Sequence, residues 1–179
     1  MSGFKKGPSW KTKGLALLTV LSITCLGLAS STASAAENVP QSIVDSTFGK
    51  DGNVITNLGG SDVANSTAIQ QDGKIIVAGH SDNDFALARY NTGGDLDTSF
   101  DTDGTVTTNF GGTDYGYSVA VQTDGKIILA GFSNVNGNYD FALARYNTDG
   151  SLDTSFDTDG TVTTDLGGDD YGYSVAVQT

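Results

Sequence analysis

Cysteine and histidine are nearly absent from this chain of 179 residues, which has one of each. Cys25 lies in an apolar stretch near the N-terminus, so no disulfide, zinc-thiolate site or thiol nucleophile is expected in the rest of the chain. His80 is the single histidine, and no second histidine or thiol supports it. We therefore expect neither a Ser-His-Asp triad nor a histidine metal site, which leaves paired carboxylates for acid-base chemistry.

Basic residues are also scarce. The chain has nine Lys and Arg against 21 Asp and Glu, and Glu37 is the only glutamate. Such an acidic chain repels phosphate backbones, so nucleic acid is excluded as a partner. The charge suits a surface that keeps an exported protein dispersed, or one that binds a divalent cation. Intrinsic disorder is a third interpretation, but the regular alternation of apolar residues argues against it.

Long apolar runs are missing except at the N-terminus. The apolar stretch 14–28 follows four lysines and precedes Ala33-Ser34-Ala35, an order typical of a secretory signal peptide. We predict a signal peptide at 1–35, a leader at 36–44 and a secreted or surface-exposed product with no membrane segment after cleavage. Its net charge would be 5 − 21 = −16. A membrane anchor is disfavoured because spanning needs about 20 residues, and lipidation of Cys25 is a minor alternative.

The most regular feature of the chain is a repeated segment. Residues 97–123 return as 153–179 with 24 of 27 positions identical, and a looser copy begins at Asp45. The copies therefore start 52 and 56 residues apart. A period of about 50 residues is typical of a blade or solenoid array, in which each unit buries its apolar faces against its neighbours.

Each copy has the pattern of four short strands joined by tight turns. The strands expected in one copy are 67–70, 74–78, 85–91 and 105–109, and in the next they are 117–122, 126–130, 141–147 and 161–165. The first two strands flank an Asp-Gly pair, Asp72-Gly73 or Asp124-Gly125. This pair is a strong hairpin signal and favours a type I′ turn.

The apolar runs in these strands, such as KIILAG, indicate that both faces of each sheet are covered. A β-propeller blade is covered by two neighbours. A parallel β-helix is the alternative, but its coils need about half this repeat length and its strands are not joined by hairpins. We therefore predict an all-β fold of antiparallel four-stranded β-propeller blades over residues 45–179.

These motifs also resemble a known family. The runs DGKIILAG, FALARYNTDGSLDTSF, DGTVTTDLGG and SVAVQTDGK occur in order and in register. Together they resemble the bacterial delta-60 repeat, a β-propeller repeat of extracellular proteins, over residues 45–179. The resemblance implies propeller architecture and export, and the family has no established catalytic residues. The glycine usual before the turn is kept as Gly49 but replaced by Asp101 and Asp157.

The array is incomplete. It holds about two and a half repeats, whereas propellers close with roughly four to eight blades. The strand expected at 173–178 lacks a following hairpin partner and would leave an open edge. We expect a fragment of a longer repeat protein, with assembly of several chains as the alternative. The expected partners are thus further repeats or other copies.

The pattern Asp-x-Asp-Gly occurs twice and is similar to the start of a calcium loop. Its carboxylates are Asp101, Asp103, Asp157 and Asp159. Asp97 and Asp153 could add ligands, but calcium needs six to eight oxygens. Asp and Gly also form turns without a metal, and the looser copy has Gly49-Lys50-Asp51-Gly52. Calcium at these four aspartates is the candidate cofactor.

Other residues have less specific patterns. The loop at 133–140 is four residues longer than its counterpart and is the best candidate for contacts with a protein or carbohydrate. Arg89 and Arg145 are expected to pair with a nearby aspartate, because a buried charge needs a partner. The repeated tyrosines are expected to pack between blades. We predict a binding or structural scaffold without catalysis, and the alternative is a secreted hydrolase or lyase using Asp pairs on polysaccharide.

Overall fold

The computed structural model describes residues 44–135 and 137–178. They belong to a compact unit assigned to Gln41–Thr179. The predicted signal peptide, 1–35, lies outside the described residues, as does the leader up to residue 43. Across the described part of the chain, no helix is long and apolar enough to cross a membrane.

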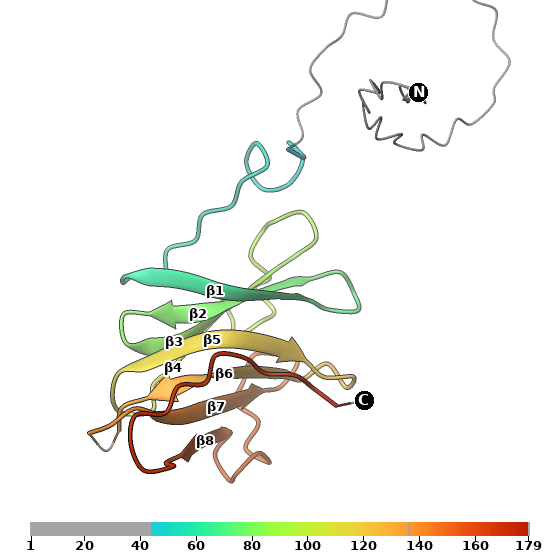
Figure 1. Ribbon diagram of the computed structural model, residues 1–179. Helices are drawn as coiled ribbons and strands as arrows, with labels where there is room; N and C mark the ends of the chain where they lie inside the picture. The colour runs from blue at the N-terminus through green and yellow to red at the C-terminus, as the bar shows by residue number, and fades with distance from the viewer. Residues whose placement is uncertain (1–43, 136, 179) are drawn as a thin grey trace, which may run out of the picture. The chain divides into compact units, whose positions relative to one another are not determined.

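The chain folds into two four-stranded antiparallel sheets, each with its strands in chain order (Figure 1). Blade 1 contains β1 (Asp62–Ile69), β2 (Ile75–Ser81), β3 (Asp84–Tyr90) and β4 (Thr105–Thr108). Blade 2 contains β5 (Asp114–Val121), β6 (Ile127–Ser133), β7 (Asp140–Tyr146) and β8 (Thr161–Thr164). The predicted all-β blades are confirmed.

The first two strands of each blade are longer than predicted. In blade 2, β5 begins at residue 114 and β6 ends at residue 133, beyond the expected ranges. Gly116 pairs with Gly131, and the register shifts at a β-bulge between Gly116 and Ser118. A Cβ added to Gly131 would lie 1.9 Å from the carbonyl oxygen of Tyr115. Glycine therefore lets two backbones approach closely here and does not end the strand.

The hairpins are present, but the predicted type I′ turn is wrong. Gly73 has a φ of +83°, whereas Asp72 is not among the residues with positive φ. The Gly73 amide donates to the carbonyl of Gln70, and the Gln70 amide donates to the carbonyl of Lys74. This is a three-residue loop, a type I turn followed by a left-handed glycine. It needs a positive φ at one position only, which glycine supplies.

The two blades pack face to face. Side chains alternate between the faces of a strand, so each blade has two faces. The forward face of blade 1 carries Ile76, Ala78, Phe85 and Leu87, all at most 1% exposed. The rear face of blade 2 carries Ile127, Leu129, Ala142, Ala144 and Tyr146, which are equally buried and belong to the same hydrophobic cluster. The core is therefore the interface between the blades.

A flanking segment lies against the rear face of blade 1. Residues 45–58 correspond in the repeat to residues 97–110, which form the loop after β3 and the outer strand β4. The Gly49 amide donates to the Gly93 carbonyl at 2.7 Å, as the Asp101 amide donates to the Asp149 carbonyl at 2.8 Å. The segment is therefore seated as part of a neighbouring blade would be.

A second flanking segment, 170–178, lies against blade 2. The Val175 amide donates to the Ser118 hydroxyl at 3.2 Å, and the Val119 amide of β5 donates to the Ser66 hydroxyl at the same distance. Residues 171–178 nevertheless form no strand. The strand predicted at 173–178 is thus absent, because the described residues offer its edge no pairing partner.

Candidate functional site

A buried aspartate in blade 1 forms ion pairs with two basic side chains. Asp97 Oδ2 lies 2.7 Å from Arg89 Nε and 2.9 Å from Lys74 Nζ. The Ser99 hydroxyl donates to its other carboxylate oxygen at 2.7 Å. The Arg89 guanidinium lies 4.6 Å from the centre of the Phe100 ring, a cation-π contact. The expected pairing of Arg89 with an aspartate is confirmed.

Blade 2 repeats this arrangement. Asp153 Oδ2 lies 2.7 Å from Arg145 Nε and 2.7 Å from Lys126 Nζ, and Arg145 stacks on Phe156 at 4.6 Å. Asp97 and Asp153, which the sequence offered as additional calcium ligands, are therefore both paired with Lys and Arg side chains. Their recurrence in both blades indicates a structural role in holding the third strand to the loop that follows it.

These contacts shift the pKa of both carboxyls. Burial by itself raises the pKa of Asp97, but hydrogen bonds from Ser99 and Lys74 and the charge of Arg89 outweigh it and hold that pKa well below its usual range. Hydrogen bonds from Lys126 and Ser155 lower the pKa of Asp153 in the same way. Both groups are carboxylates at neutral pH and are poor candidates for a general acid.

The four predicted calcium ligands lie exposed in the two loops before β4 and β8. Asp103 Oδ1 accepts the amide and the hydroxyl of Thr105, both at 2.8 Å, and Asp159 accepts the same groups of Thr161. Asp101 and Asp157 have φ values of +44° and +45°. The carboxylates thus also stabilise the turns, and calcium binding stays a prediction.

The structure brings together three other carboxylates that the sequence pattern does not predict to be neighbours. Asp140, Asp165 and Asp170 have ligand atoms within 4.8 Å of one another, and no other such acidic group occurs among the described residues. Asn138 Nδ2 donates to Asp140 Oδ1 at 2.7 Å. The available signal was the change from Asn109 to Asp165 between otherwise similar copies. This change gives blade 2 a third carboxylate, Asp165, next to Asp140 and Asp170.

Asp114 is fully buried in blade 2. It accepts hydrogen bonds from the Ser133 hydroxyl and from the Phe110 amide, the latter at 2.7 Å. Burial raises the pKa of Asp114, and the charge of Asp84 adds to that effect. A raised pKa is typical of acid-base residues, but here the two hydrogen bonds join β5 to β6 and to the loop before β5.

Aromatic side chains form a continuous row from blade 1 to the C-terminal flanking segment. His80 stacks on Tyr115 with ring centres 4.1 Å apart, and Phe132 contacts Tyr115 at 5.5 Å and Tyr171 at 4.9 Å. Burial lowers the pKa of His80, and its buried Nδ1 has no hydrogen-bond partner within the described structure. His80 is therefore a packed residue. Tyr115 packs between the blades as predicted, whereas Tyr171 and Tyr173 are 37% and 64% exposed.

The long loop after β6 makes internal contacts. The Tyr139 amide donates to Asp169 at 3.1 Å, and Asn138 Nδ2 donates to the Gly168 carbonyl at 2.5 Å. Val135 remains 43% exposed, and residue 136 lies outside the described part. The loop thus holds the segment that leads to 170–178, while contacts with a protein or carbohydrate stay a prediction.

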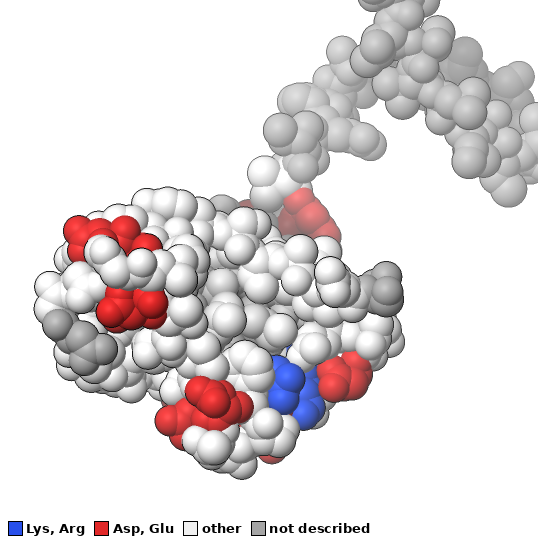
Figure 2. Space-filling model, turned by 60° about the horizontal axis from the view of Figure 1, so that its bottom comes forward, with Lys and Arg blue, Asp and Glu red and all other residues white. Residues whose placement is uncertain are grey.

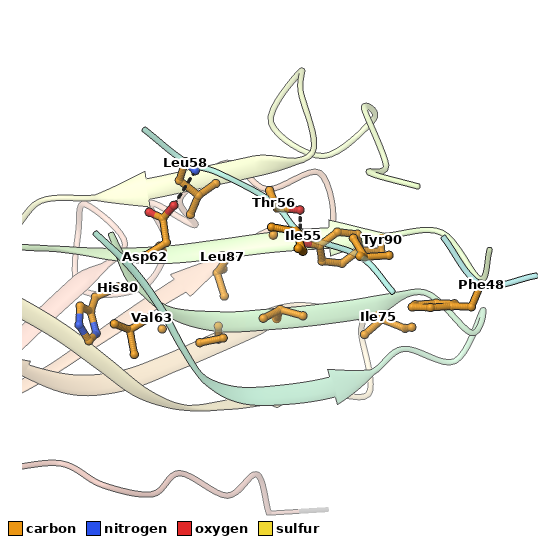
Figure 3. Close-up of a pocket in the computed structure, with 17 residues that line it drawn as sticks. Phe48, Ile55, Thr56, Leu58, Asp62, Val63, Ile75, His80, Leu87 and Tyr90 are labelled. Atoms are coloured by element: carbon orange, nitrogen blue, oxygen red, sulfur yellow. Dashed lines mark hydrogen bonds between the residues drawn. The ribbon is translucent and has the colours of Figure 1, made fainter. Parts of the chain in front are cut away.

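A cavity of about 420 Å³ lies between the rear face of blade 1 and the first flanking segment. Figure 3 shows Phe48, Ile55 and Ile75 among its apolar lining. Its polar contacts are internal, as the Tyr90 hydroxyl donates to Thr56 Oγ1 at 2.7 Å and Asp62 accepts the Leu58 amide. The equivalent rear face of blade 2 is packed on blade 1. The apolar lining of this cavity is therefore explained by a blade face that no complete neighbouring blade covers among the described residues.

The surface charge is divided into patches. On the face shown in Figure 2, acidic side chains gather in separate groups, and the visible basic side chains lie beside acidic ones. Most of the described aspartates lie in turns and loops between the strands. The described surface therefore presents no continuous charged groove on this face.

Comparison with known proteins agrees with this geometry. Residues 70–100 and 122–156 match a family described as a domain of unknown function (DUF5122) beta-propeller. Over these two segments the chain is similar to that family, and its two four-stranded sheets have the fold of β-propeller blades. Each matched segment of the repeat runs through its second and third strands to the paired aspartate and the following phenylalanine. No match was found among curated proteins or solved structures.

Proposed function

We propose that this propeller repeat protein is an exported scaffold without catalytic activity, in which blades stack to present binding surfaces. One observation carries the proposal: the aspartates buried in the described structure, Asp97, Asp114, Asp140 and Asp153, all hydrogen-bond to groups that hold the fold. A buried acid-base pair free for a substrate is not found among the described residues.

Export is supported by the basic, apolar and small-residue order of residues 1–35. The strongly acidic composition of the remainder suits a soluble extracellular surface. The delta-60 resemblance points in the same direction. A fusion of residues 1–44 to a reporter that is active only outside the cytoplasm tests this part. A reporter that remains inactive and uncleaved would contradict it.

The binding surface proposed for a protein or carbohydrate ligand is the loop after β6 together with the neighbouring segment. Val135 and Tyr171 expose 43% and 37% of their surface there, and Asn138 lies in the same loop as Val135. Aromatic rings with adjacent amide and carboxylate groups suit a sugar or a peptide. Calcium at Asp101, Asp103, Asp157 and Asp159 remains part of the proposal as a stabilising ion.

The competing function is a hydrolase or lyase acting on polysaccharide. The observation that favours it is the raised pKa of Asp114, since a general acid needs such a shift. The decisive experiment incubates the purified chain with neutral and acidic polysaccharides and measures new reducing ends and unsaturated products. We expect neither. Product formation that is lost in Asp114→Asn, with folding retained, would overturn the scaffold proposal.

A further inference from the structure

A second cavity, of about 340 Å³, lies between the two blades where the hairpins after β1 and β5 turn. Blade 1 contributes Gln70, Lys74 and Arg89 to its wall, and blade 2 contributes Val121 and Thr148. Residues of two complete four-stranded sheets therefore form this cavity, and neither flanking segment lines it.

The cavity begins where the apolar rows of blade 1 end. Ile76 lies opposite Ala68 in β1 and opposite Arg89 in β3, so these three side chains share the forward face. Gln70 and Lys74 lie two residues from Ala68 and Ile76, and they face the same way because side chains alternate along a strand. The apolar core between the blades thus ends in a polar edge.

The two basic side chains of this edge are held by internal contacts. The Arg89 guanidinium donates from Nη1 to the Thr148 carbonyl at 2.5 Å and from Nε to Asp97 at 2.7 Å. Lys74 Nζ lies 2.9 Å from Asp97 Oδ2 and 3.6 Å from Asp72 Oδ2, and 28% of its side chain is exposed. An ammonium group has three donors, so Lys74 retains one for an oxygen in the cavity.

The glutamine is not explained by internal contacts. Gln70 Oε1 is buried and has no hydrogen-bond partner among the described residues, and the same is true of Gln122 Oε1 at the equivalent position of blade 2. Buried polar atoms normally have a partner, and an apolar side chain would pack there without leaving an acceptor unsatisfied. The last torsion of a glutamine side chain is soft, so the Gln70 amide can turn toward a ligand in the cavity.

The charge around the cavity selects against anions. Asp72 and Asp124, at the turns of the two hairpins, line the cavity and are exposed. Each carboxylate accepts the backbone amide two residues further on at 3.1 Å, which fixes its position. Together with Asp97, three carboxylates therefore face the two cations, Lys74 and Arg89, and a further negative charge would be repelled.

We propose that this cavity between the blades binds a neutral saccharide of one or two rings. Sugar hydroxyls both donate and accept hydrogen bonds, and therefore match the Gln70 amide, the Lys74 ammonium and the Asp124 carboxylate. Val121 offers an apolar contact to the ring carbons. The volume is near the lower limit of small-molecule sites, about 300 Å³, and no aromatic ring is among the described lining residues to stack on a nucleobase.

The site is distinct from the binding surface proposed above, because the hairpin before β6 and the loop after β6 lie at opposite ends of that strand. The test titrates the isotope-labelled full chain with glucose, galactose, lactose and galacturonic acid and follows the amide resonances. We expect saturable shifts at Gly73, Gly125 and Thr148 with millimolar dissociation constants for the neutral sugars. Galacturonic acid, which differs from galactose by a carboxylate, should bind at least about tenfold more weakly. No saturable shift with any neutral sugar, or equal binding of galacturonic acid, overturns the inference.

Three substitutions locate the site. Gln70→Leu should weaken binding at least about tenfold without lowering the melting temperature, because Oε1 loses no hydrogen bond. Val121→Phe fills the cavity from blade 2 and should also block binding. Tyr171→Ser, on the surface proposed after β6, is the control and should bind as the original chain does. Unchanged binding in Gln70→Leu or Val121→Phe, a melting temperature lowered by Gln70→Leu, or loss of binding in Tyr171→Ser overturns the inference. The last result would place the sugar at the loop after β6 and leave the scaffold proposal standing.

Discussion

Phe85 and Phe141 occupy equivalent positions in consecutive blades, but Phe85 is fully buried while 37% of Phe141 is exposed. Phe85 also meets the Phe110 ring edge-on with centres 4.9 Å apart. The same residue in the same local sequence therefore contributes differently to stability, because only one of the two lies under a neighbouring blade.

Phe85→Ala should lower the free energy of unfolding by about 3–5 kcal/mol, the usual cost of a cavity at a buried phenylalanine. Phe141→Ala is the matched control and should cost clearly less, because its ring already contacts water. Urea unfolding followed by tyrosine fluorescence measures both. Equal losses in the two variants would show that the forward face of blade 2 is covered in solution.

The close approach of backbones at the β-bulge gives a second matched pair. Gly131→Ala should destabilise the chain by about 1–3 kcal/mol, as overpacking does, since its Cβ would lie 1.9 Å from a carbonyl oxygen. Gly93→Ala meets nothing within 4 Å and requires no positive φ, so its effect should be small. Thermal unfolding compares them, and a Gly131→Ala variant as stable as the original chain would contradict the bulge geometry.

Stability should fall in acid. The pKa values of Asp97 and Asp153 are lowered in the folded state, so their stabilisation is complete above the unfolded value of about 3.9 and is lost as pH falls below it. Urea unfolding between about pH 2 and pH 6 should show this decline. The double variant Asp97→Asn, Asp153→Asn should be less stable at neutral pH and should show a flatter profile.

Asp114 provides the control of opposite sign. Its pKa is raised by burial, so its own contribution is largest when protonated and declines as pH rises through the folded pKa. Replacement by asparagine should therefore steepen the rise of stability with pH above about pH 4. A profile of Asp114→Asn identical to that of the original chain would contradict the raised pKa.

The calcium prediction has a readout that separates it from turn formation. If the loops bind calcium, millimolar calcium should raise the melting temperature, and Asp103→Asn with Asp159→Asn should abolish that rise. The same variants should be less stable without calcium, because Asp103 caps the Thr105 amide. Asp165→Asn, which restores the residue found at position 109, is the control. A calcium effect lost only in Asp165→Asn would place the ion elsewhere.

Much of the blade could be predicted from local sequence. Alternating apolar residues and the Asp-Gly pairs specified four strands and their hairpins, because strand periodicity and turn chemistry act over a few residues. The turn type and the ends of the strands could not be predicted. The ends of the strands depend on the approach of Gly131 to Tyr115 across the sheet, a contact between strands that local pattern does not specify.

The candidate sites divide in the same way. The pairing of Arg89 with an aspartate followed from the rule that a buried charge needs a counter-charge. The group of Asp140, Asp165 and Asp170 could not be found from spacing, because its members come from β7 and from the loop after β8. Their proximity results from the return of the chain to the end of the sheet.

The octapeptide YGYSVAVQ marks the limit of local sequence most clearly. In the first copy residues 115–121 belong to β5, and in the second copy the same sequence at 171–178 forms no strand. By itself, the sequence determined the repeat, the alternation of faces and the propensity for strands. Tertiary structure decided which copy becomes a strand and which apolar face is buried, because a strand needs a hydrogen-bonded neighbour and an apolar face needs a covering blade.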